Sequence, residues 1–154
     1  MKNRKKGFSL VELLIVLAVM AALIATITPV ALNAIKKSKA TQVAQNLKTL
    51  ASAIENKGYV DGTNVFTSSL LIKNLARDIK TEDYGAYILT GTNGQYTVTV
   101  FHKGTDADYS TVLGVLQGVT KGAVTTSTNG FFLNDGLSST NSDTIKYVIQ
   151  FTIY

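Results

Sequence analysis

Hydrophobic and polar positions divide the chain into three segments, of which the first is apolar on every side. It runs from Phe8 to Leu32 and includes an unbroken apolar stretch from Leu13 to Ala25. As a helix this segment would measure about 37 Å, whereas the hydrocarbon core of a bilayer is about 30 Å thick. The pattern therefore predicts a membrane-spanning helix.

The second segment is amphipathic. After Lys39 the apolar residues recur at steps of three and four, which predicts a helix with one apolar stripe: Ala40, Val43, Ala44, Leu47, Leu50, Ala51 and Ile54. Lys57 and Gly58 are typical of a helix C-terminus, so the economical interpretation is one helix from Phe8 to near Lys57. A membrane span and a separate core helix, divided at Pro29, is the alternative that the sequence leaves open.

The third segment, residues 59–154, predicts a small sheet with short helices. Strands are expected at 87–90 and 95–102, joined by a turn at Asn93-Gly94, and at 131–133. The last strand is the clearest, because alternate positions share one apolar face: Ile145, Tyr147, Ile149, Phe151 and Ile153. Short helices are expected at 68–79, capped by Ser68 or Ser69, and at 108–116, where a loop is the alternative. Three to five antiparallel strands laid on the Ala40–Ile54 stripe give an α+β fold.

Composition removes much of enzyme chemistry. The chain has 154 residues, no cysteine and one histidine, so disulfides, thiolate metal sites, a cysteine nucleophile and a multi-histidine metal site are excluded. It contains no phosphate-binding loop, nucleophile elbow or carboxylate pair. His102, at the end of a predicted strand, is expected to be a surface residue without a catalytic role. We therefore expect a protein that is not an enzyme.

The net charge of +5 is concentrated at the N-terminus. Four of the 15 basic residues are Lys2, Arg4, Lys5 and Lys6, and without them 11 basic residues face 10 acidic ones. Residues 59–154 carry six basic and eight acidic side chains, which gives −2. Nucleic acid is therefore not a favoured partner, unless folding gathers a basic stripe of Lys73, Arg77, Lys80 and Lys121. The lysines at 36, 37 and 39 are interpreted as an anchor at the membrane interface rather than as a phosphate contact.

Glu12 does not fit a simple membrane anchor. An acidic residue at the centre of a membrane helix costs about 2.5–3.5 kcal/mol, and such residues usually have a function and a partner. If the chain were cut after Gly7, the new amino group of Phe8 would lie one helical turn from Glu12. A signal peptide, cleaved near the small residues at 18–22, and a plain signal anchor are the two other interpretations.

The segment Lys5-Lys6-Gly7-Phe8-Ser9-Leu10-Val11-Glu12, followed by the apolar stretch, resembles the prepilin signature of bacterial type IV pilins and type II secretion pseudopilins. The resemblance implies that a prepilin peptidase cuts between Gly7 and Phe8 and methylates the Phe8 amine. It makes Glu12, with Phe8, the determinant of filament assembly, and Pro29 the residue that kinks the helix. The specific match covers roughly residues 1–40.

The resemblance implies a long helix on a small sheet, the lollipop of this family, with four parts. These are a cleaved leader (1–7), a transmembrane and filament-core half helix (8–32), an amphipathic half helix (33–58) and a head domain (59–154). The expected function is a structural subunit of a type IV pilus-like filament, with a type II secretion pseudopilin or a DNA-uptake pilin as alternatives.

The expected partners are copies of the chain, prepilin peptidase, membrane lipid, and the inner-membrane assembly platform with its ATPase. The expected location is the inner membrane, crossed once with the N-terminus cytoplasmic, and then an extracellular or periplasmic filament. No cofactor is expected. Calcium in the head is the alternative that some pseudopilins suggest, and the candidate ligands are Asp106, Asp108, Asp135 and Asp143, although none lies in a calcium-loop spacing.

Overall fold

The computed structural model describes residues 7–67, 69–133 and 135–154, and the chain forms two compact units that meet at residues 35 and 36. Helix α1, Leu10–Asp61, contributes to both units. The predicted cationic residues of the leader, Lys2, Arg4, Lys5 and Lys6, lie outside the described residues, as does Ser68. The α+β architecture, a long N-terminal helix with a small antiparallel sheet, is confirmed.

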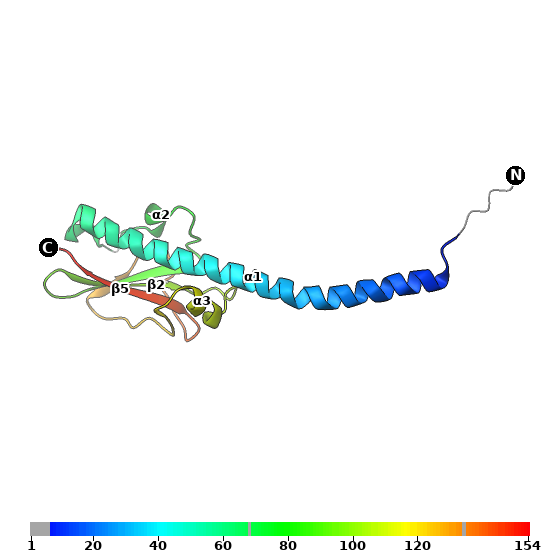
Figure 1. Cartoon of the computed structure of the whole chain (residues 1–154). Coiled ribbons are helices and arrows are strands. Elements are labelled where there is room, and N and C mark those ends of the chain that lie inside the picture. Colours follow the sequence, from blue (N-terminus) through cyan, green and yellow to red (C-terminus); the bar gives the residue numbers. More distant parts are fainter. Residues whose placement is uncertain (1–6, 68, 134) are drawn as a thin grey trace. The chain divides into compact units, whose positions relative to one another are not determined.

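The second unit is built on a five-stranded antiparallel sheet (Figure 1). Its strands are β1 (Tyr84–Thr90), β2 (Gln95–His102), β3 (Val119–Lys121), β4 (Gly130–Phe132) and β5 (Ile145–Thr152). Their spatial order is β3-β5-β2-β1-β4. The central pairings are long, because β2 pairs with β1 from Tyr96 to His102 on one side and with β5 along its whole length on the other.

The hairpin between β1 and β2 turns where the sequence predicts it. Asn93 and Gly94 both have positive φ, 57° and 74°, as a tight turn between twisted strands requires. Gly91 N–H donates to the carbonyl of Gln95 at 2.8 Å and closes the loop. Strand β1 begins at Tyr84, three residues before the predicted start, because Tyr84 and Ala86 pair with the end of β2.

The C-terminal half of α1 lies along one face of this sheet (Figure 1). Every residue of the predicted stripe is buried, and Ala40, Leu47, Leu50 and Ile54 are fully inaccessible. Alternate residues of β2 and β5 supply the opposing surface, including Val98, Val100, Ile145 and Phe151. The amphipathic pattern therefore predicted the helical side of the core correctly.

The end of α1 differs from the prediction. The helix continues past Lys57 to Asp61, and Gly62 stops it with φ 77° and ψ −170°, a backbone conformation that is essentially restricted to glycine. The N–H of Gly62 donates to the carbonyl of Gly58 at 2.9 Å. Gly58 is inside the helix for a packing reason, since a Cβ atom there would lie 2.6 Å from the ring of Phe66.

The two short helices have different outcomes. Helix α3, Tyr109–Val115, is confirmed, and the Asp108 carboxylate caps it by accepting from the N–H of Thr111 at 3.2 Å. Helix α2 is only Ile72–Leu75, much shorter than predicted, and no serine caps it. Instead the carboxylate of Asp135 accepts from the N–H of Ile72 at 2.7 Å. A 3-10 turn, η1, occupies Thr63–Val65.

Candidate functional site

The start of α1 is organised by a contact between Ser9 and Glu12. Leu13 N–H donates to the carbonyl of Ser9 at 3.2 Å, which makes Ser9 the residue that precedes the first turn. The Glu12 carboxylate accepts from the N–H of Ser9 at 2.9 Å. This is the carboxylate half of a capping box, which needs Ser or Thr followed three residues later by Glu or Gln. The spacing is present in the sequence, so this cap was predictable from Ser9 and Glu12 alone.

The predicted cleavage site lies just before this cap. Gly7 and Phe8 are exposed and precede the helix, and the Phe8 side chain is 89% exposed. Nothing lies within 4 Å of the position that a Cβ atom on Gly7 would take. The peptide bond between Gly7 and Phe8 is therefore accessible in this chain. Cleavage there and methylation of Phe8 stay predictions.

The first unit presents apolar side chains to its surroundings on every side. Its leucines, isoleucines and valines are all at least 47% exposed, the value for Val16, and Val30 is 68% exposed. No residue in the most apolar stretch of α1 is buried, and the helix is long and apolar enough to cross a bilayer. A core helix of a soluble domain would be buried instead. This surface needs lipid or other apolar helices around it.

Polar groups inside the apolar half are satisfied locally. Thr26 Oγ1 donates to the carbonyl of Leu23 at 2.9 Å, and Thr28 Oγ1 donates to that of Ile24 at 2.7 Å. Pro29 lies inside α1, whose helical assignment continues through it. Pro29 has no N–H to donate, and hydroxyls bonded back to the helix favour bending. The kink at Pro29 stays a prediction.

Comparison with known protein families finds a match to this N-terminus. The family described as "Prokaryotic N-terminal methylation motif" matches residues 2–28, which include Gly7, Phe8 and Glu12. This motif is the prepilin signature of type IV pilins and pseudopilins, and its presence supports a pilin-like substrate of prepilin peptidase. Comparisons with curated proteins and with solved structures return no match.

The motif is associated with three general properties of the proteins that bear it. Proteins that bear it are processed at the N-terminus, are anchored in a membrane by the apolar helix, and assemble into filaments as structural subunits. It covers only the N-terminal segment, so the head of this chain is interpreted from its own geometry.

The four aspartates proposed as calcium ligands have separate structural partners. Asp108 caps α3 and Asp135 caps α2, while Asp143 pairs with Lys121 at 2.8 Å. Asp106 accepts from the ring of His102 at 2.9 Å. Among the described residues, no group of three or more histidine, aspartate or glutamate side chains is placed to hold a metal ion. The structure does not bring these four carboxylates together.

His102 is not a surface residue, contrary to the prediction. It is 1% exposed, and its ring lies 4.6 Å from that of Tyr84 between centroids. Its Nε2 bonds to Asp106, while Nδ1 is buried without a hydrogen-bond partner. Helix α1 joins the group through Asn46, whose Nδ2 donates to the Tyr84 hydroxyl at 3.1 Å. A polar cavity of about 120 Å³ adjoins these four residues.

The pKa values of Tyr84 and Asp106 in this cluster are shifted in opposite directions. Burial is the main reason that the pKa of Tyr84 is raised, and the charges of Asp106 and Asp83 add to the effect against the hydrogen bond from Asn46. Burial also acts to raise the pKa of Asp106, but the hydrogen bond and charge of His102 outweigh it and leave that pKa lowered. The cluster thus favours an ionised Asp106 and a protonated Tyr84 hydroxyl, which suits a structural contact between α1 and the sheet.

Proposed function

We propose that the chain is the structural subunit of a type IV pilus-like filament and polymerises through the apolar half of α1 after its leader is removed. The observation that carries the proposal is a helix with exposed apolar side chains on every side and one carboxylate, Glu12, in its first turn. Lipid covers this surface before assembly. Sister helices cover it in the filament, because they offer the same apolar environment.

Glu12 supplies the polar contact of that assembly. In the uncut chain it is bonded to the N–H of Ser9. Cleavage after Gly7 creates a cationic amine on Phe8, and the attraction between this amine and a neighbour's Glu12 is strong in an apolar environment. Such a pair fixes the axial register of two helices, which apolar contacts alone leave undefined.

The geometry of the head favours a structural role over binding of nucleic acid. Of the four cations that would have to form a basic stripe, Lys80 lines a cavity together with Asp78, Asp83 and Asp106. Lys121 is paired with Asp143. Neither lysine therefore offers an uncompensated positive charge to a phosphate backbone. A secretion pseudopilin remains the nearer alternative, and long filaments on the cell surface that contain this chain would favour the pilus.

The proposal places the chain in the inner membrane with its leader in the cytoplasm, from where the assembly platform and its ATPase extract it. Mass spectrometry of the mature chain tests the processing step. We expect a chain that begins at a methylated Phe8. Retention of residues 1–7, or a cut near Ala22, would contradict it.

Glu12→Gln tests the assembly step, and Glu55→Gln, on the same helix but outside its apolar half, is the matched control. We expect normal cleavage in both variants. Filament yield should fall on the order of tenfold or more for Glu12→Gln alone, because its charged pair is lost. Wild-type filament yield from cleaved Glu12→Gln would remove Glu12 from the proposal.

A second measurement concerns Pro29. We expect residues 25–29 to bend or unwind in the assembled filament, since this stretch combines the proline with two hydroxyls bonded back to the helix. Electron cryomicroscopy of filaments would report it directly. A straight, unbroken helix through Thr28 would oppose the expectation.

A further inference from the structure

The sheet of the head has an open edge. Strand β5 pairs with β2 along its full length, but β3 pairs only with its first part, from Lys121 opposite Ile145 to Val119 opposite Tyr147. The remaining stretch, Val148–Thr152, therefore forms the edge of the sheet on that side. We call this stretch the β5 edge.

The backbone direction along the β5 edge follows from two flanking bonds. Ile153 N–H donates to the carbonyl of Gly94 at 2.9 Å, so residue 153 faces the hairpin of β1 and β2. The carbonyl of Thr144 accepts from Gly122 N–H at 2.9 Å, so residue 144 faces the β3 side. Because an antiparallel strand alternates, Gln150 and Thr152 point their N–H and C=O groups outward. In the described part of the chain these four groups have no hydrogen-bond partner.

The β5 edge lacks the features that natural proteins use to block strand addition. Such features are charged side chains, proline, bulges or a covering loop. Val148–Thr152 contains neither a charged residue nor proline, and its pairing with β2 continues without a bulge. Val148, on the face opposite α1, is 42% exposed. The edge is thus competent to pair with another strand.

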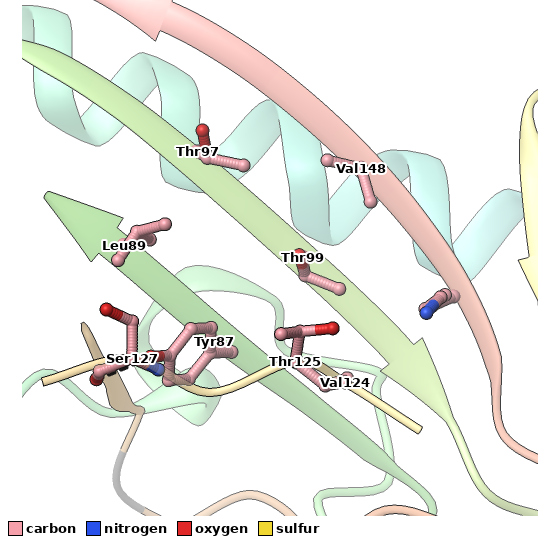
Figure 2. Close-up of a pocket in the computed structure, with 9 residues that line it drawn as sticks. Tyr87, Leu89, Thr97, Thr99, Val124, Thr125, Ser127 and Val148 are labelled. Carbon is pink, nitrogen blue, oxygen red and sulfur yellow. Dashed lines mark hydrogen bonds between the residues drawn. The ribbon is translucent and has the colours of Figure 1, made fainter. Parts of the chain in front are cut away.

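A pocket adjoins the β5 edge on the sheet face opposite α1 (Figure 2). It has a volume of about 250 Å³. Strands β1, β2 and β5 form its floor through Leu89, Thr97, Thr99 and Val148, and the segment from Val124 to Ser127 forms a wall. Figure 2 shows these side chains on the same face of the three strands.

The wall of this pocket is held at both ends. The Tyr87 hydroxyl donates to the carbonyl of Ser127 at 3.0 Å. Lys146 Nζ donates to the carbonyl of Ala123 at 2.9 Å. Lys146 is also the one charged side chain among the described residues that line the pocket. The pocket is therefore a fixed, largely apolar recess with a positive rim, which favours a neutral or acidic ligand.

We propose that the β5 edge and this pocket together bind an extended segment of another protein, which adds to the sheet beside β5. Such strand addition takes its affinity from main-chain hydrogen bonds and its specificity from pockets for alternate side chains. The segment has an apolar residue that enters the pocket beside Val148, and a neutral or acidic residue near Lys146. Its middle is uncharged, because it lies against an uncharged edge.

A second copy of the chain fits this site less well. The other edge of the sheet is β4, which has three residues, and the N–H of Gly130 already donates to Ser127 O at 3.1 Å. Strand β4 therefore offers too short a run of free backbone groups to match the β5 edge. The β5 edge of a second copy carries Val148, Gln150 and Thr152 on its pocket face, and opposing Val148 to Val148 would overlap β3. Paired within the open stretch, a second copy therefore brings polar residues rather than an apolar one to the pocket. The proposal is independent of filament assembly, which is assigned to α1.

The test uses the full chain in detergent micelles, labelled with ¹⁵N, and an acetylated and amidated peptide of about seven residues, a typical strand length. The peptide alternates threonine and valine and carries one terminal glutamate. Amide hydrogen exchange is the readout. We expect the N–H groups of Gln150 and Thr152 to gain about tenfold protection or more, while those of Ile149 and Phe151, already paired with β2, change little. The same peptide N-methylated on alternate amides should have no effect.

Two variants test whether binding of the peptide depends on the backbone of the β5 edge. Gln150→Pro removes an outward N–H that the fold does not use, and Gln150→Thr changes the side chain while keeping that N–H. Binding should weaken about tenfold for the first and stay near the wild-type value for the second. If Gln150→Pro does not fold, Val148→Lys, which places a charge beside the edge, should weaken binding to a similar degree.

Three results would overturn the proposal. One is the absence of protection at Gln150 and Thr152 at millimolar peptide. Another is that folded Gln150→Pro binds the peptide as tightly as the wild type, or that Val148→Lys does so if Gln150→Pro does not fold. The third is protection of the same two amides that rises with protein concentration without peptide, because the occupant would then be a second copy of the chain.

Discussion

Leu47 and Leu32 lie on the same helix in opposite environments, and this contrast predicts how the two halves of α1 respond to truncation. Leu47 is fully buried against the sheet, whereas Leu32 is 53% exposed in the apolar half. We expect Leu47→Ala to destabilise the head strongly. Leu32→Ala should leave the stability of the head unchanged and serves as the matched control.

The magnitude follows from burial. Removing buried carbon atoms costs about 0.8 kcal/mol per CH2 group, which gives roughly 2.4 kcal/mol for Leu→Ala before any cavity remains. Incomplete collapse of the cavity raises the usual range to about 2–5 kcal/mol. The rigid sheet behind Leu47 limits collapse, so we expect about 3 kcal/mol. For a domain of this size that lowers the midpoint of thermal unfolding by on the order of 10 °C.

The assay is thermal and urea unfolding of the full chain in micelles, followed by near-ultraviolet circular dichroism of the tyrosines. These residues are concentrated in the head, and Tyr84, Tyr87 and Tyr96 are buried there. A loss below about 1 kcal/mol for Leu47→Ala, or an equal loss for Leu32→Ala, would refute the reasoning. The first result would mean that the stripe does not hold the helix on the sheet. The second would mean that the apolar half is packed against the head.

Two further predictions concern the head. Folding lowers the pKa of Asp106, so its contact with His102 stabilises the head at pH values above the ordinary pKa of an aspartate. This stabilisation is lost as the pH falls through the pKa that Asp106 has in the folded state. Urea unfolding of the wild type and of Asp106→Asn at a series of pH values should therefore converge in strong acid; a constant difference down to pH 2 would contradict the assignment. Gly62→Ala should destabilise by about 1 kcal/mol because φ there is 77°. Gly114→Ala, inside α3 with open space around its Cβ position, should be neutral or stabilising, and the reverse order in thermal unfolding would show that backbone strain does not govern Gly62.

The sequence predicted those parts of the fold in which a periodic pattern and burial coincide. The Ala40–Ile54 stripe and the β1–β2 hairpin are of this kind. Strand β3 was missed because Val119–Lys121 is short and becomes a strand only through pairing with β5, far along the chain. The cap on α2 was missed for the same reason, since it comes from Asp135 rather than from a neighbouring serine.

The burial of His102 could have been predicted. The alternation of β2 places it on the same face as Tyr96, Val98 and Val100, which faces α1. Its position at the end of a strand suggests exposure, but the period of two along β2 predicts burial. The N-terminal site was predicted in more detail, because cleavage, charge and anchoring depend on adjacent residues rather than on the fold.

The strand order has a consequence for the timing of folding. Strand β5 lies between β3 and β2, so the sheet cannot form its central ladder until residues 145–152 are available. Until then only β1, β2 and β4 can cover the Ala40–Ile54 stripe, which is synthesised more than ninety residues before β5 is complete. Contacts between such distant segments form slowly. The nascent chain therefore passes through a period in which its helix is formed and its head is incomplete, and any factor that protects an exposed apolar stripe would act in that interval.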